Sequence, residues 1–145
     1  MLELKVQLVA LDQNDQFVVV LTDKENKVAL PIWVGVAEAQ SIAIRLKNEK
    51  FPRPLTHDLF VSWCDATDSK IDKVIISDIT ADSTYLAQIH LKHQNQNKII
   101  DSRPSDAIAL ALRSDAGIYM APKLIEFTHD FEDLFTEDFG GGKIH

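Results

Sequence analysis

Residues 98–113 read KIIDSRPSDAIALALR, and this short segment holds a strand end, a turn and a helix. The apolar run Lys98–Ile100 predicts a strand. Pro104 suits the first position of a helix because its fixed φ is helical and its missing N–H loses no hydrogen bond there. The mostly apolar Ser105–Arg113 then predicts the helix itself. Three charged residues stand at this strand-to-helix junction: Asp101, Arg103 and Asp106.

The same order of elements is predicted earlier in the chain. Alternating or β-branched runs predict strands over 2–11, 17–22 and 28–34, and apolar residues at helical spacing follow Gly35. In the second half, strands are predicted over 73–77, 85–91 and 98–100. A shift of 66 residues superimposes the two halves, for example Ile42 on Ile108. We therefore expect an α+β fold with a duplicated β-β-β-α unit, whose mixed or antiparallel sheet packs against helices.

Composition indicates a single domain followed by an acidic tail. The net charge of −7 is concentrated after Leu124, where six carboxylates face one lysine, while the preceding part has 14 basic and 16 acidic residues. We expect one domain over 1–126 and an acidic C-terminal tail over 127–145. The tail has the pattern of an amphipathic helix that ends in a disordered tip around its three glycines.

Other features narrow the class of protein. The single cysteine, Cys64, excludes an intrachain disulfide framework and a multi-cysteine zinc site. The sequence has no signal-peptide pattern and no apolar run near the length of a membrane span, so we expect a cytoplasmic protein without a membrane partner. Trp33, Trp63 and Cys64 lie in apolar settings and are predicted to pack in the core.

The charged junction allows two interpretations. In the structural one, Asp106 caps the helix and Arg103 pairs with Asp101. In the functional one, a helix N-terminus beside an arginine binds an anion, and the two carboxylates hold Mg²⁺ or Mn²⁺, which prefer oxygen ligands. An anion site next to a metal site is what phosphodiester cleavage needs.

A second motif, PRPLTHD at residues 52–58, offers similar groups. Thr56 is predicted to cap a helix, which places His57 and Asp58 in its first turn. Both are solvated surface residues in the structural interpretation. In the functional one, His57 is a general acid or base and Arg53 a phosphate contact. Glu38, soon after Gly35, is another first-turn carboxylate that serves either as a helix-terminus charge or as a ligand.

Three stretches together resemble the bifunctional nuclease family, bacterial and plant proteins credited with DNase and RNase activity. They are LPIWVGVAEAQSIAIRL at 30–46, FPRPLTHDL at 51–59 and IIDSRPSDAIALALR at 99–113. The resemblance covers residues 1–126 and implies a duplicated α+β fold, a homodimer or higher homo-oligomer, and nuclease activity. Asn48 and Asp68 stand at turns where the family pattern leads us to expect glycine.

The resulting hypothesis is a metal-assisted nuclease that hydrolyses phosphodiester bonds of DNA, RNA or both. The roles of individual residues follow from chemistry. The predicted catalytic residues are His57, Asp101 and Asp106. The predicted substrate-binding residues are Arg53, Thr56, Arg103 and Ser105. The predicted ligands of Mg²⁺ or Mn²⁺ are Asp101, Asp106, Asp58 and Glu38. The alternative is a non-enzymatic oligomeric module that binds an anionic ligand or a protein partner. Its support is the near-neutral charge before the tail, because tight non-specific binding of nucleic acid usually needs a clear basic surface.

Overall fold

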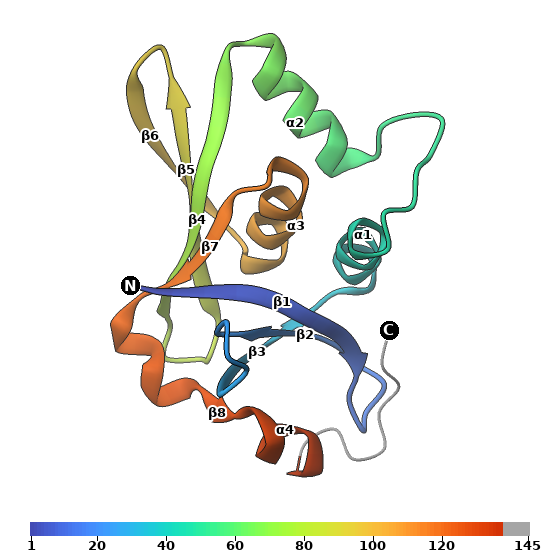
Figure 1. The fold of residues 1–145 in the computed structure, drawn as a ribbon, viewed down its shortest axis with the longest axis vertical. Coiled ribbons are helices and arrows are strands. Elements are labelled where there is room, and N and C mark those ends of the chain that lie inside the picture. The colour runs from blue at the N-terminus through green and yellow to red at the C-terminus, as the bar shows by residue number, and fades with distance from the viewer. Residues whose placement is uncertain (138–145) are drawn as a thin grey trace.

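A computed structural model describes residues 1–137, which form one eight-stranded sheet with helices on both faces (Figure 1). The strands are β1 (Leu2–Leu11), β2 (Phe17–Thr22), β3 (Val28–Val34), β4 (Ser69–Ile79), β5 (Tyr85–His93), β6 (Gln96–Ser102), β7 (Gly117–Met120) and β8 (His129–Asp130). The helices are α1 (Val36–Leu46), α2 (Thr56–Ala66), α3 (Pro104–Ser114), the 3₁₀ helix η1 (Pro122–Phe127) and α4 (Phe131–Glu137).

The sheet consists of two three-stranded meanders joined by β7. Its order is β6-β5-β4-β7-β1-β2-β3-β8, and β7 pairs in parallel with β4 but antiparallel with β1. The element order β-β-β-α occurs twice, as β1-β2-β3-α1 and as β4-β5-β6-α3, with α2 between the copies. The predicted α+β class and mixed sheet are confirmed.

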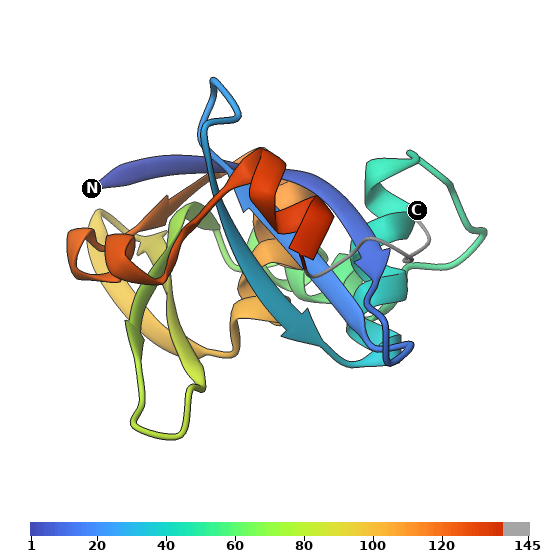
Figure 2. The same ribbon diagram turned by 90° about the horizontal axis from the view of Figure 1, so that it is seen from below.

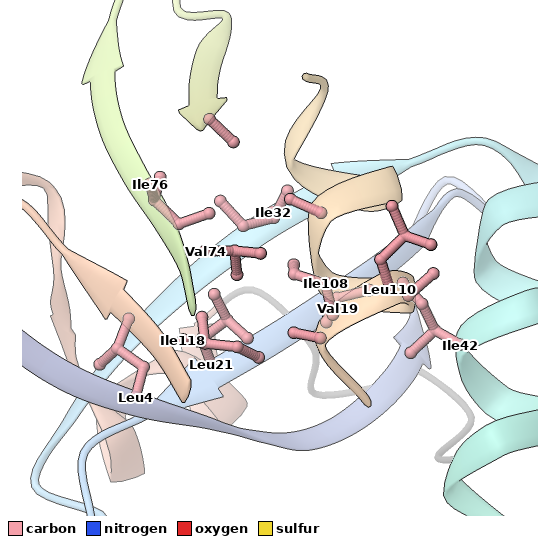
Figure 3. Close-up of a cluster of buried hydrophobic side chains, with 14 of the residues drawn as sticks. Leu4, Val19, Leu21, Ile32, Ile42, Val74, Ile76, Ile108, Leu110 and Ile118 are labelled. Carbon is pink, nitrogen blue, oxygen red and sulfur yellow. The ribbon is translucent and has the colours of Figure 1, made fainter. Parts of the chain in front are cut away.

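The central helix α3 organises the main core. Ala107–Ala111 are all buried, and Ile108 lies among side chains from both meanders, including Val19 and Val74 (Figure 3). Figure 1 shows the two strand groups crossing, with α3 in the angle between them and α1 and α2 beyond it. A helix that is apolar on most sides is stable only when other parts of the protein cover those sides. The absence of charge in Ala107–Leu112 is therefore consistent with its central position. No helix within residues 1–137 combines the length and apolarity that crossing a membrane requires.

Strand β2 is buried on both faces of the sheet. Val19 and Leu21 belong to the α3 core, whereas Val18 and Val20 belong to a second cluster with Leu134 of α4. This alternation follows from the period of two in a strand. Helix α4 therefore covers the opposite face of β2 and β3 (Figure 2). The expected disordered tip of the tail lies outside the described residues.

Two turn positions have the backbone conformation that favours glycine. Asn48 and Asp68 both have φ of 54°, the left-handed conformation that glycine adopts without strain.

The prediction that both tryptophans are core residues is wrong, because Trp33 is 48% and Trp63 is 58% exposed. The Trp33 indole N–H instead donates to Asp12 Oδ2 at 2.9 Å.

Candidate functional site

The two predicted motifs meet beside α3. His57 at the start of α2 lies 2.9 Å from Asp106 in the first turn of α3, measured from Nε2 to Oδ1. They come together because α1 and α2 both pack against α3. A pocket of about 400 Å³ opens between the first turns of all three helices. Its walls include Glu38 of α1, Thr56 of α2, and Arg103 at the start of α3.

The three helices point their N-termini at this pocket, and no N-cap residue caps its helix with its own side chain. Their N-cap residues are Gly35, Leu55 and Arg103, none of which has a side chain that accepts a hydrogen bond. The prediction that Thr56 is the cap is wrong, because it is the first helical residue. Three positive helix ends and Arg103 favour an anion in the pocket, whereas the carboxylates of Glu38 and Asp106, which also line it, oppose one.

Both ring nitrogens of His57 are engaged. Nε2 contacts Asp106, and Nδ1 lies 2.6 Å from Ser41 Oγ in the second turn of α1. Only 14% of the His57 side chain is exposed. A carboxylate that binds one nitrogen of an imidazole fixes the ring's orientation and favours the proton on that nitrogen.

Arg103 connects α3 to α1. Its Nε donates to Asp106 Oδ2 at 2.9 Å, its Nη2 forms an ion pair with the same oxygen at 2.9 Å, and its Nη1 donates to Glu38 Oε1 at 3.1 Å. The predicted pairing with Asp101 is therefore replaced by two other carboxylates. These contacts raise the pKa of Arg103, mainly through Asp106. Burial acts to raise the pKa of Asp106, but hydrogen bonds from His57 and Arg103 outweigh it and hold that pKa below 3.8.

Asp58 faces a different arginine. The Arg113 Nε donates to Asp58 Oδ1 at 2.7 Å, and Asp58 Oδ2 accepts the Leu55 backbone N–H at 3.0 Å. Only 4% of the Arg113 side chain is exposed, and its other nitrogens donate to the carbonyls of Ala109 and Ser41. Arg113 thus ties the three helices together, which is a structural role for Asp58.

The remaining predicted residues lie at varying distances from the pocket. Ser105 is buried and lines a neighbouring pocket of about 300 Å³, which shares Glu38 and Arg103 with the first. Arg53 is exposed and donates to the carbonyl of Pro52, and it does not line either pocket. Asp101 is exposed on β6 opposite Gln88 and lines neither pocket.

The four predicted metal ligands do not form one cluster. Among the side chains that the structure describes, which end at Leu134, no group of three or more His, Cys, Asp or Glu residues is arranged to hold a metal ion. Asp58 binds Arg113, and Asp101 lies outside the pocket. Glu38 and Asp106 share a contact with Arg103, so a guanidinium neutralises the one pair of predicted ligands that comes together.

Sequence reasoning missed two residues of this region. Ser41 lies within the stretch 30–46 that carries the family resemblance, but no charge or turn distinguishes it from other helical serines. Arg113 ends the stretch 99–113 and looks like an ordinary basic residue in a last helical turn. Only the packing of the helices shows that Ser41 contacts His57 and that Arg113 contacts Asp58.

Comparisons with known proteins show which family this chain is similar to. The sequence profile of the bifunctional nuclease domain matches residues 19–131, which include every residue of the pocket. Two proteins of Mycobacterium tuberculosis, uncharacterized protein MT1877 of strain CDC 1551 / Oshkosh and uncharacterized protein Rv1829 of strain ATCC 25618 / H37Rv, are each 34% identical to the chain. Each match extends over 119 residues, 81% of this chain and 70% of the relative. The chain belongs to the bifunctional nuclease family.

Proposed function

We propose that this protein is a nuclease, and that the pocket between the three helix N-termini cleaves phosphodiester bonds of DNA, RNA or both. The observation that carries the proposal is the convergence of His57, Asp106 and Arg103 on a pocket between the N-termini of three helices. An acid–base group beside an anion site is the minimum that phosphodiester cleavage requires.

In this proposal Arg103 and the helix ends hold the phosphate. The Arg103 side chain is 64% exposed although it contacts two carboxylates, so it is open to a phosphate oxygen. Thr56 lines the pocket and offers a hydroxyl group, and Ser105 offers one in the neighbouring pocket. Arg53, exposed on the segment before α2, is a candidate contact for phosphates farther along the strand.

His57 is the proposed acid–base group. Asp106 fixes one ring nitrogen, and Arg103 fixes Asp106, so the imidazole is held in one orientation. A positioned acid–base side chain accelerates such reactions by about 10²- to 10⁴-fold. The catalytic role of Asp101 stays a prediction from the sequence and has no part in this proposal, because Asp101 lines neither pocket.

A divalent cation, Mg²⁺ or Mn²⁺, also stays a proposal, and no step above depends on it. Glu38 and Asp106 are the two predicted ligands that share a neighbour, and Mg²⁺ is often bound by one or two carboxylates together with substrate phosphates. When bound, the ion would stabilise negative charge on the reacting phosphate.

The direct test uses the purified chain with labelled single-stranded DNA, double-stranded DNA and RNA, each with added Mg²⁺, added Mn²⁺ or a chelator. We expect cleavage that His57→Ala abolishes and that a surface control, His129→Ala, leaves unchanged. Equal cleavage by wild type and His57→Ala would assign the activity to a contaminant and overturn the proposal.

A second candidate is a non-enzymatic module that binds an anion or a protein. Two observations favour it: Arg103 is already paired with two carboxylates, and α2 exposes the apolar side chains of Leu59 and Trp63. Binding of labelled oligonucleotides without cleavage, under every metal condition, would support this alternative.

We also propose that the chain works in the cytoplasm as a homodimer or higher homo-oligomer. The exposed Leu59 and Trp63 lie one helical turn apart on α2, an arrangement that suits a subunit contact. Light scattering coupled to size exclusion tests this assembly, with Trp63→Glu expected to shift the mass toward a monomer.

A further inference from the structure

Three side chains from three helices form a connected chain at the pocket. They are Ser41 of α1, His57 of α2 and Asp106 of α3, joined by contacts of 2.6 Å and 2.9 Å. An ionised carboxylate only accepts hydrogen bonds, so Nε2 of His57 must carry the proton that Asp106 accepts. In the neutral ring, Nδ1 is then an acceptor, and the hydroxyl of Ser41 must donate to it.

This arrangement leaves His57 without a free nitrogen for substrate. Nε2 faces Asp106, and Nδ1 faces Ser41. A proton that moves between His57 and a substrate therefore passes through Ser41 unless a contact breaks. A hydroxyl within hydrogen-bond reach of a base, with that base oriented by a third group, is the pattern of an activated nucleophile.

Ser41 is also accessible and firmly held. It lines the pocket, together with the apolar side chains of Ile44, Phe51 and Leu55. Arg113 Nη2 donates to the carbonyl of Ser41 at 3.1 Å, which fixes this turn of α1 against α2 and α3. Arg103, in the same pocket, supplies positive charge where a phosphate would bind.

We propose that Ser41 is the nucleophile of this site and attacks electrophilic phosphorus with His57 as its base. The inference deepens the proposed function, because it places a covalent seryl phosphodiester on the route to cleavage. Nothing in the sequence patterns marked Ser41, and its assignment depends on its two contacts and its place on the pocket wall.

The chemistry is balanced with water as the second reactant. Ser41 Oγ bonds to phosphorus while its proton moves to His57 Nδ1. The bond from phosphorus to one nucleoside oxygen then breaks, and that oxygen takes the proton from Nδ1. In the second half, water gives a proton to Nδ1 and its oxygen bonds to phosphorus. The bond to Ser41 breaks, and Oγ recovers the proton.

A simpler reading is that the Ser41 hydroxyl only fastens α1 to α2. That reading predicts a change in stability when the hydroxyl is removed, but no chemical reactivity at Oγ. Covalent modification of Ser41 Oγ therefore distinguishes the two interpretations. This test works even if the protein does not cleave nucleic acid.

The experiment treats the full chain with a fluorophosphonate, whose phosphorus is attacked with loss of fluoride, and follows adducts by intact-protein and peptide mass spectrometry. We expect one adduct on Ser41. Ser41→Ala should remove it, His57→Ala should slow its formation by about 10²-fold or more, and Ser41→Cys should restore a nucleophile. Ser114→Ala, a partly buried serine in the last turn of α3, is the matched control and should label like wild type. Circular dichroism checks that each variant is folded.

The outcomes distinguish this inference from the nuclease proposal. Labelling of Ser41 that depends on His57 supports the inference, provided that any cleavage of nucleic acid is lost in Ser41→Ala. Absence of a Ser41 adduct in folded wild type, or nuclease activity that survives Ser41→Ala, overturns the inference and leaves the nuclease proposal intact. Labelling without cleavage of any nucleic acid would overturn the nuclease proposal alone.

Discussion

His57 and Asp106 are 49 residues apart in the chain, yet Nε2 of the first lies 2.9 Å from Oδ1 of the second. Each belongs to the first turn of a helix, α2 or α3, and each comes from one of the two predicted motifs. The contact makes Asp106 a positioning residue for His57, because it fixes the ring and its protonated nitrogen.

Asp106→Asn should therefore impair turnover more than substrate binding. The amide keeps the size of the side chain but allows the wrong tautomer of His57, a change that lowers kcat by as much as about 10⁴-fold in a hydrolase with a similar acid–base pair. We expect kcat to fall by about 10²-fold or more and its pH profile to shift, with KM nearly unchanged. Steady-state cleavage of a labelled oligonucleotide measures all three.

Asp101→Asn is the matched control for this prediction, since Asp101 is exposed and lies outside the pocket. We expect its kcat to stay close to wild type. A loss as large as that of Asp106→Asn would restore the catalytic role that the sequence suggested for Asp101 and would require a different arrangement of the substrate.

Arg113→Met should destabilise the fold. The Arg113 side chain is almost fully buried and binds Asp58 and the carbonyls of Ala109 and Ser41, so its removal takes one partner from a carboxylate and from two carbonyls. Removing one member of a buried ion pair costs about 3–5 kcal/mol, and the partial exposure of Asp58 places the expected loss toward the lower end. Urea denaturation measures the free energy of unfolding.

Arg45→Met provides the control for Arg113→Met. Arg45 is exposed, and its Nε donates to the carbonyl of Leu112 at 3.3 Å. We expect a change within about 0.5 kcal/mol, as is usual for surface substitutions. A loss in Arg113→Met as small as the one expected for Arg45→Met would mean that Arg113 does not tie the three helices together.

Sequence patterns predicted elements well where the period of hydrophobicity is strong. The strands of both meanders, α1 and α3 follow directly from such periods, and Pro104 correctly marks the start of α3. Trp33 was misplaced because an alternating strand presents every second residue to the other face, and no local pattern says whether that face is covered.

Sequence patterns placed the residues of the site on their helices but did not predict which side chains contact one another. Local spacing placed His57 and Asp106 in first helical turns, which the structure confirms. It could not show that Arg103 reaches Glu38, 65 residues away, or that Ser41 faces His57, because these contacts depend on how α1 and α2 pack against α3. Long-range pairing of side chains is a property of tertiary packing, so one sequence leaves it open.

The loss of folding stability at acidic pH should depend on the carboxyl groups of Asp58 and Asp106. Both have a pKa below 3.8: burial opposes the shift in each, while hydrogen bonds from Leu55 and Arg113, or from His57 and Arg103, outweigh it. A lowered pKa in the folded state means that this stability is fully present above the ordinary value and is lost as the pH falls through the lowered one. Urea midpoints measured from about pH 6 to about pH 2 should therefore fall less steeply in Asp58→Asn and Asp106→Asn. Curves parallel to wild type would contradict this.

Cys64 should resist thiol reagents while the protein is folded. The residue is 2% exposed on α2, and burial, together with nearby Asp65, raises the pKa of its thiol. A buried, protonated thiol is a poor nucleophile. We expect iodoacetamide to modify it only in urea, with a rate that follows the unfolded fraction. Rapid modification without denaturant would mean that α2 separates from the core in the folded protein.

Glu38→Gln separates two roles for that carboxylate. If Glu38 only holds Arg103, the amide leaves the guanidinium less neutralised and freer to bind phosphate. Cleavage should then persist, and the slope of log K against log salt for nucleic-acid binding should steepen by up to about 0.7–0.9, the contribution of one further phosphate contact. If Glu38 instead ligates a divalent ion, kcat should collapse and recover as Mg²⁺ or Mn²⁺ is raised, because a weakened site is filled at higher metal concentration. We expect the first result, since Arg103 Nη1 already donates a hydrogen bond to Glu38 Oε1 at 3.1 Å.

Two measurements distinguish these roles of Glu38. Binding titrations at several salt concentrations give the salt slope, and cleavage assays over a range of metal concentrations show whether added metal restores kcat.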